Sequence, residues 1–164
     1  MNNNTKYLTF NAIIAALYVT LVFTLNFMSY DVIQVRLAEV LIFLVLVDKR
    51  YSLGICLGCF VANLLGPFGI VDAIIGTTAT FLCCLLLTLF KKDFLALIIV
   101  PVCNILVGLE LAFLLGLNFP AAVLNTVFVM IGELICMIIG LVIYRLFIKK
   151  LSTVNDDAKS WLYI

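Results

Sequence analysis

The sequence predicts an all-α integral membrane protein, a compact bundle of six transmembrane helices with both termini in the cytoplasm. Of the 164 residues, 66% are hydrophobic and only 12% are charged, whereas soluble domains contain about 45–50% apolar and about 25% charged residues. The apolar residues form six segments with short breaks, and the basic residues concentrate on one side of those segments. We therefore expect one membrane domain over residues 1–164.

Each apolar segment predicts one helix, because charges, glycine or proline interrupt the chain between segments. A helix needs about 20 apolar residues to cross the hydrocarbon core. The second and third segments have about 16 residues each, so an alternative joins them into a re-entrant pair. Further apolar runs follow the first one, which we interpret as a span and not as a removable signal. The predicted spans are 7–28, 32–47, 51–66, 69–90, 94–117 and 121–148, with a cytoplasmic tail at 152–164.

The basic residues predict the orientation. Only Arg36 falls on one side of the six-span arrangement, and the other nine fall on the opposite side. The positive-inside rule assigns that opposite side, with both termini, to the cytoplasm. A five-span arrangement would break this pattern. The nine are Lys6, Lys49, Arg50, Lys91, Lys92, Arg145, Lys149, Lys150 and Lys159.

Small residues recur at four-residue spacing in two helices, which allows close helix approach in lipid. Gly54, Gly58 and Ala62 lie in the third segment, where packing inside the bundle is the favoured interpretation. Ala12 and Ala16 lie in the first segment, where packing inside the bundle and docking of another membrane protein both stay open.

Several classes of function have no support in the sequence. The chain has no histidine, no phosphate-binding loop and no nucleophile-elbow motif, so we predict neither an enzyme nor a bound cofactor or metal. The net charge of +1 and the dispersed basic residues give no reason to expect a nucleic-acid partner. The six cysteines lie in apolar runs and are interpreted as small buried packing residues. No internal repeat is evident, so transport would need an outside energy source or would be passive.

Ionisable side chains inside the spans mark the candidate site, because such groups are costly in a membrane. Arg36 and Glu39 are three residues apart and can share a helical face and pair. Asp72 follows the turn at 66–69, where a carboxylate can serve the site or only stabilise a helix N-terminus.

Two further acids lie in the last two spans. Glu110 follows Pro101 and Asn104, where a proline distorts the helix and can open it toward a cavity. Glu133 lies near the middle of the last span, and its alternative is a protonated acid bonded to a neighbour. Several carboxylates around one outward-facing cavity predict a neutral or cationic ligand rich in hydrogen-bond donors.

Three ordered motifs carry a family resemblance: VIQVRLAEVL at 32–41, LGCFVANL at 57–64 and VDAIIGTTAT at 71–80. Together they resemble the QueT family, the substrate-binding S components of energy-coupling-factor (ECF) transporters, and the resemblance covers most of the chain. It implies a multi-pass subunit of a bacterial plasma membrane that captures a queuosine precursor, queuine or 7-aminomethyl-7-deazaguanine. It also implies docking on an ECF module, in which a transmembrane coupling protein joins two ATPases that hydrolyse ATP.

The resemblance and the physical argument together select the candidate residues. A guanine-like base presents an N–H beside an amine, which one carboxylate can accept, while its carbonyl needs a donor such as Asn63 or Asn104. Ala12 and Ala16 resemble the docking surface of such subunits. The alternatives are an S component for a different vitamin or nucleobase, and a scaffold subunit that binds no ligand. The motif matches are Gln34, Arg36, Glu39, Asn63, Asp72, Gly76 and Thr80, and Glu110 and Glu133 rest on the physical argument.

Overall fold

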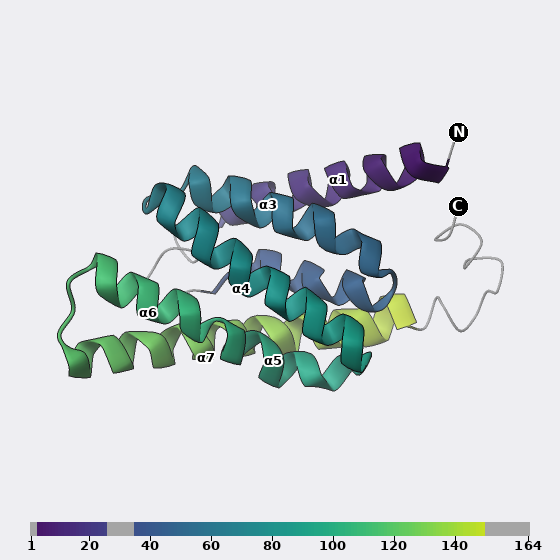
Figure 1. Cartoon of the computed structure of the whole chain (residues 1–164). Coiled ribbons are helices and arrows are strands. Elements are labelled where there is room, and N and C mark those ends of the chain that lie inside the picture. The colour runs from purple at the N-terminus through teal and green to yellow at the C-terminus, as the bar shows by residue number, and fades with distance from the viewer. Residues whose placement is uncertain (1–2, 26–34, 150–164) are drawn as a thin grey trace.

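The computed structural model describes residues 3–25 and 35–149, and throughout this part of the chain the regular elements are helices (Figure 1). The all-helical prediction is confirmed, and each of the six predicted segments contains a helix. Gln34 and the predicted tail at 152–164 lie outside the described residues. The elements are α1 (Asn3–Thr24), η1 (Leu37–Leu46), η2 (Lys49–Tyr51), α3 (Ser52–Leu64), α4 (Gly69–Phe90), η3 (Asp93–Leu95), α5 (Ala96–Cys103), α6 (Ile105–Leu114), α7 (Phe119–Ile143) and η4 (Tyr144–Lys149).

Four stretches in the described residues are long and apolar enough to cross a membrane: Thr5–Thr24, Gly69–Phe90, Asp93–Leu114 and Phe119–Phe147. The other two predicted spans correspond to shorter helices, η1 with 10 residues and α3 with 13. Because η1 is a 3₁₀ helix, which rises about 2.0 Å per residue, it reaches roughly 20 Å where an α-helix would reach about 15 Å. The count of six spans, the orientation and the single domain stay predictions.

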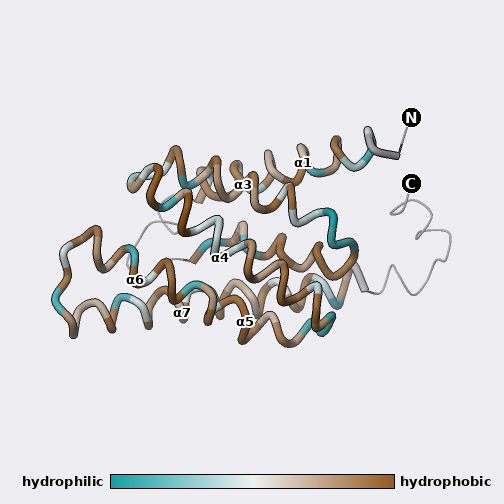
Figure 2. Tube along the Cα trace, viewed as in Figure 1, coloured by the Kyte–Doolittle hydropathy of each residue, from teal (hydrophilic) through white to brown (hydrophobic). Residues whose placement is uncertain are grey.

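The outside of the bundle is apolar, as lipid contact requires. Large side chains such as Phe113 (85% exposed) and Leu8 (73% exposed) point away from the core. In Figure 2 most of the length of the helices has the hydrophobic colour, and hydrophilic positions occur at the turns at both ends of the bundle. This distribution fits a chain whose helices are surrounded by lipid.

The fifth predicted span is broken, as the position of Pro101 predicts. Proline has no backbone N–H to donate, so α5 cannot continue regularly through this region. It ends at Cys103, and α6 begins at Ile105. Asn104 lies between them, and both its backbone N–H (3.0 Å) and its side-chain amide (3.2 Å) donate to the carbonyl oxygen of Val100.

Helices α1 and α3 pack through glycine. A Cβ atom at Gly54 would lie 2.6 Å from the backbone oxygen of Asn11, and one at Gly58 would lie 2.6 Å from the Cβ of Tyr18. The backbone N–H of Gly54 also donates to the Asn11 side chain at 2.6 Å. The packing interpretation of the glycines in the third segment is therefore confirmed.

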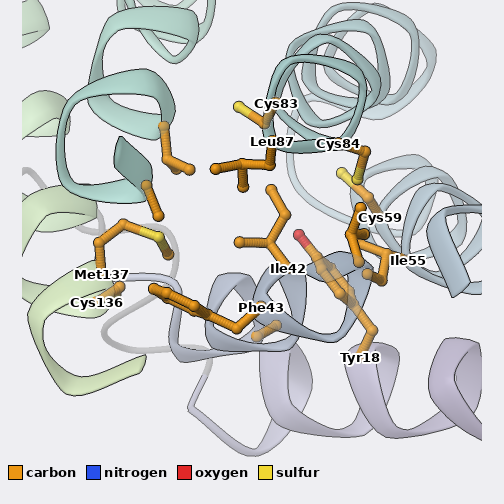
Figure 3. Close-up of a cluster of buried hydrophobic side chains, with 14 of the residues drawn as sticks. Tyr18, Ile42, Phe43, Ile55, Cys59, Cys83, Cys84, Leu87, Cys136 and Met137 are labelled. Atoms are coloured by element: carbon orange, nitrogen blue, oxygen red, sulfur yellow. The ribbon is translucent and has the colours of Figure 1, made fainter. Parts of the chain in front are cut away.

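The main hydrophobic core lies where α1, η1, α3, α4, α5 and α7 converge (Figure 3). Ile42 and Phe43 of η1 are at its centre and contact the surrounding helices, with Leu87 of α4 and Met137 of α7 fully buried beside them. Five of the six cysteines, at positions 59, 83, 84, 103 and 136, are buried in this core as small packing residues. The core thus fixes η1 against the longer helices, and η1 in turn carries Glu39 and follows Arg36.

Gly54→Ala should lower the free energy of unfolding by about 1–3 kcal/mol, because the new methyl group overlaps the α1 backbone and the two helices must separate. The check is the unfolding midpoint of the purified protein in detergent. Leu57→Ala is the matched control: it changes the exposed face of the same helix (54% exposed) and should shift the stability by less than about 0.5 kcal/mol. Equal effects of the two substitutions would contradict the packing argument.

Candidate functional site

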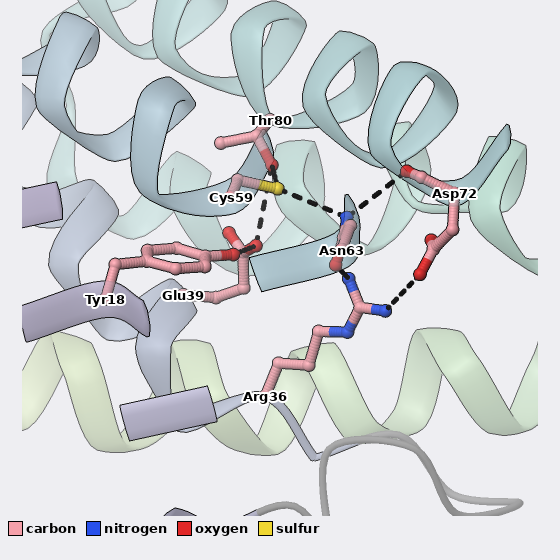
Figure 4. A network of polar contacts seen from close by, with 7 residues as sticks. All are labelled: Tyr18, Arg36, Glu39, Cys59, Asn63, Asp72 and Thr80. Carbon is pink, nitrogen blue, oxygen red and sulfur yellow. Dashed lines mark hydrogen bonds and ion pairs between the residues drawn. The ribbon is translucent and has the colours of Figure 1, made fainter. Parts of the chain in front are cut away.

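Arg36 occupies the middle of a buried polar cluster (Figure 4). It immediately precedes η1 and is only 3% exposed. Its Nη1 donates to Oδ1 of Asn63 at 3.1 Å, and its Nη2 lies 3.5 Å from Oδ2 of Asp72. The ion pair that the structure shows for Arg36 is therefore with Asp72 on α4. A buried guanidinium keeps its charge and needs such partners.

Asn63 joins α3 to the start of α4. Its amide nitrogen donates to the backbone oxygen of Asp72 at 3.2 Å and to the sulfur of Cys59 at 3.5 Å. A Cβ atom at position 76 would overlap this amide nitrogen, so glycine is required there for the close approach of the two helices. Asn63 thus holds Asp72 in position while it accepts from Arg36.

Glu39 is held from two other helices. The hydroxyl of Tyr18 on α1 donates to Oε1 of Glu39. Thr80 on α4 lies 3.5 Å from the same oxygen and 3.3 Å from the sulfur of Cys59. Tyr18, Glu39 and Thr80 are at most 2% exposed. These contacts connect α1, η1, α3 and α4 at one level of the bundle.

Two more carboxylates approach the cluster from α6 and α7. Glu110 is 5% exposed and Glu133 is 2% exposed. The positive charge of Arg36 acts on both of them and also on Glu39 and Asp72. Within the described part of the chain, neither oxygen of Glu110 accepts a hydrogen bond, and Oε2 of Glu39 and Oε2 of Glu133 accept none either.

The cluster has an excess of acceptors over donors. Four ionised carboxylates beside one guanidinium would leave net negative charge in a buried site, which is costly. Protons, or a ligand that brings N–H donors or positive charge, would relieve this cost. An anionic ligand would be disfavoured, because the cluster has one guanidinium and four acids. Among the described residues no group of His, Cys, Asp and Glu is arranged to hold a metal ion.

The structure brings together six of the eight residues that the sequence selects for ligand binding. Asn104 instead lies at the α5–α6 break, where its amide bonds to Val100, and Gln34 is outside the described residues. Within the described residues the six that the structure brings together are buried, and the outward-facing cavity stays a prediction. The six are Arg36, Glu39, Asn63, Asp72, Glu110 and Glu133, all at most 5% exposed.

Tyr18 belongs to the cluster and was missed by the sequence reasoning. A signal was present, because a tyrosine in the middle of an apolar helix needs a partner for its hydroxyl. What the sequence could not provide is the identity of that partner, Glu39, which is 21 residues away.

Ionisable side chains buried inside a helical membrane bundle are typical of membrane proteins that bind or transport a solute. A family model described as "QueT transporter" matches residues 8–149. The chain belongs to the QueT transporter family.

One curated relative is similar over part of the chain. It is the queuosine precursor transporter QueT of Lactococcus lactis subsp. cremoris (strain MG1363), and it is 40% identical over 89 residues. The match covers 51% of this chain and 52% of the relative, so the chain spans about half of the length of the curated protein that it matches. No solved structure matches the chain.

Replacing Arg36 with methionine should lower the free energy of unfolding by about 3–5 kcal/mol, because it leaves the carboxylate of Asp72 buried without the guanidinium that pairs with it. The double variant Arg36→Met/Asp72→Leu should recover a large part of that loss, because it removes both members of the ion pair. Unfolding midpoints of the two single variants and the double variant measure the coupling. Additive effects would show that the two side chains do not interact energetically.

Proposed function

We propose that the chain is the substrate-binding subunit, or S component, of an ECF-type transporter that imports a queuosine precursor. The observation that carries the proposal is the buried cluster in which Arg36 pairs with Asp72 and three further acids are buried, in a chain that belongs to the QueT transporter family. The name of the Lactococcus lactis relative supports the same class of substrate. Queuine and 7-aminomethyl-7-deazaguanine are the two candidates.

The chemistry of these bases fits the acceptors of the cluster. A 7-deazaguanine offers an N–H and an exocyclic amine on one edge, which suit the two oxygens of a single carboxylate. An aminomethyl group adds a cation that a second carboxylate can neutralise. The oxygens of Glu110, Glu133 and Glu39 that accept no hydrogen bond in the described residues are the acceptors that such a ligand would use.

Binding requires the cluster to open, because its side chains are buried in this arrangement. The side-chain amide of Asn63 donates to the backbone oxygen of Asp72 and to the sulfur of Cys59, so it can donate to a ligand carbonyl only if one of these two bonds is exchanged. In this proposal Asn63 therefore positions Arg36 and Asp72 while the cluster is closed. It contacts the ligand directly only after the cluster opens.

The first experiment is the thermal stability of the purified chain in detergent with queuine, 7-aminomethyl-7-deazaguanine, guanine and a panel of vitamins. A ligand at a hundred times its dissociation constant adds about 2.7 kcal/mol to the stability of the folded state. Stabilisation by the deazaguanines alone is the expected result. Stabilisation by a vitamin would indicate an S component for that vitamin. No stabilisation by any compound would favour a scaffold subunit that binds no ligand.

Amide variants test the carboxylates. Glu133→Gln should weaken the apparent ligand affinity at least tenfold, because a carboxylate that can accept two hydrogen bonds from the ligand is lost. Asp72→Asn should weaken it as well, because the ion pair that positions Arg36 is lost. Asp93→Asn is the control, since it changes an acid that pairs with Arg145 on the surface (2.9 Å) and should leave the ligand response unchanged. Wild-type ligand-induced stabilisation of the cluster variants would contradict the assignment of the site.

The same proposal assigns partner docking to α1. Ala12 and Ala16 are both exposed on α1, and small residues at this spacing allow another helix to approach closely. The partner is the ECF module, a transmembrane coupling protein with two ATPases. ATP hydrolysis then belongs to the module and not to this chain.

Ala16→Leu should abolish co-purification with the ECF module and uptake, while ligand-induced stabilisation stays at the wild-type level, because the new side chain points outward. Thr78→Leu enlarges an exposed residue on α4 and should affect neither. Uptake assays and pull-down from membranes measure the two variants side by side. Wild-type uptake by Ala16→Leu would remove α1 from the docking surface.

A further inference from the structure

A basic cavity lies at the opposite end of α4 from the buried cluster. It has a volume of about 520 Å³ and forms where the end of η1 and the turn before η2 meet the last turn of α4. Three cationic side chains, from Lys49, Arg50 and Lys91, and one carboxylate, from Asp48, line it. The positive-inside rule assigns this end of the bundle to the cytoplasmic surface of the membrane.

Asp48 and Arg50 neutralise each other. The guanidinium of Arg50 lies 2.8–3.1 Å from the carboxylate oxygens of Asp48 and stacks 3.5 Å from the ring centre of Tyr7. Burial raises the pKa of Asp48, but the hydrogen bonds from Arg50 outweigh this effect and the net shift is downward. Asp48 therefore stays ionised and paired at neutral pH.

Lys49 and Lys91 differ from Arg50 in this respect. Within the described residues, neither ammonium group has a carboxylate within ion-pair distance. The cavity therefore carries two positive charges that its own walls do not compensate. A dianionic or monoanionic group of phosphate size would complement them.

The backbone at Lys91 has a conformation that glycine usually adopts. Lys91 ends α4 in the left-handed conformation (φ 52°, ψ 29°) and is the one non-glycine residue with positive φ in the described chain. Glycine is the usual residue at such a helix end, and other residues incur a steric cost of about 1 kcal/mol. The sequence places an ammonium group at this position in spite of that cost.

A narrow apolar hollow continues from the basic cavity into the membrane region. It has a volume of about 160 Å³, shares Lys49 and Thr88 with the cavity, and is also lined by Ser52, Phe81, Cys84 and Leu85. Phe81, Leu85 and Thr88 lie on successive turns of α4. The hollow therefore follows α4 away from the charged end, along the surface that lipid covers.

We propose that the cavity and the hollow together bind one anionic phospholipid of the cytoplasmic leaflet. Its phosphate would lie between Lys49 and Lys91, and an acyl chain would lie along Phe81 and Leu85. The charge of the cavity selects an anionic headgroup, and the adjoining apolar hollow selects a lipid over a soluble phosphate ester. Basic pockets between transmembrane helices on this side of a membrane are suited to such headgroups. The proposal does not depend on the transported substrate.

The test is native mass spectrometry of the full chain in detergent with phosphatidylglycerol or phosphatidylcholine that have the same acyl chains. The wild-type protein should retain phosphatidylglycerol at least tenfold more tightly, and glycerol 3-phosphate should not compete at equal concentration. Lys49→Gln and Lys91→Gly should each weaken phosphatidylglycerol binding about fivefold. Lys91→Gly should keep the fold, because glycine suits the backbone conformation at this position.

Lys92→Gln is the matched control, because it removes the same charge one residue away from a side chain that lines neither hollow. It should retain wild-type binding of phosphatidylglycerol. Equal binding of the two lipids, or an equal loss in Lys92→Gln and Lys91→Gly, would overturn the proposal in favour of a diffuse surface potential. Competition by glycerol 3-phosphate would show that the apolar hollow takes no part.

Discussion

The burial of the Arg36 guanidinium is the constraint on which the packing of η1, α3 and α4 depends. A guanidinium stays charged at any relevant pH, and its transfer out of water must be offset by acceptors in a fixed geometry. The side chain of Asn63 and the carboxylate of Asp72 supply these acceptors from two different helices. Their positions therefore determine how η1, α3 and α4 lie relative to one another.

Close helix contacts make this arrangement possible. The amide of Asn63 fits because position 76 has no side chain, and α1 reaches α3 because Gly54 and Gly58 have none. The approach of α1 then brings the hydroxyl of Tyr18 to Glu39. These glycines let the helices approach closely enough to bury the polar network between them. The apolar core packs against η1 and holds it in place.

The sequence predicts the helices and the polar residues of the site, but not how these residues are paired. Apolar segments and breaks locate the helices because the membrane requires about 20 apolar residues in each span. Arg36, Asp72 and Glu133 stand out because charge in such a segment is costly. Pairing depends on contacts between segments, which helical periodicity does not encode. The sequence therefore allowed Arg36 to pair with its near neighbour Glu39, whereas the structure pairs it with Asp72, and the partner of Tyr18 could not be predicted at all.

Helix α4 links the two charged regions of the molecule. Asp72 is in its first turn and Lys91 follows its last residue, so both charges are favourable to the helix dipole. At a rise of about 1.5 Å per residue, the stretch of α4 from Asp72 to Lys91 separates them by roughly 28 Å, about the thickness of the hydrocarbon core. An acid cluster at one end and uncompensated lysines at the other give the bundle an electrical polarity along the membrane normal. On the two proposals made above, this polarity would draw donor-rich or cationic ligands to the acid end, and anionic lipid headgroups would bind at the basic end.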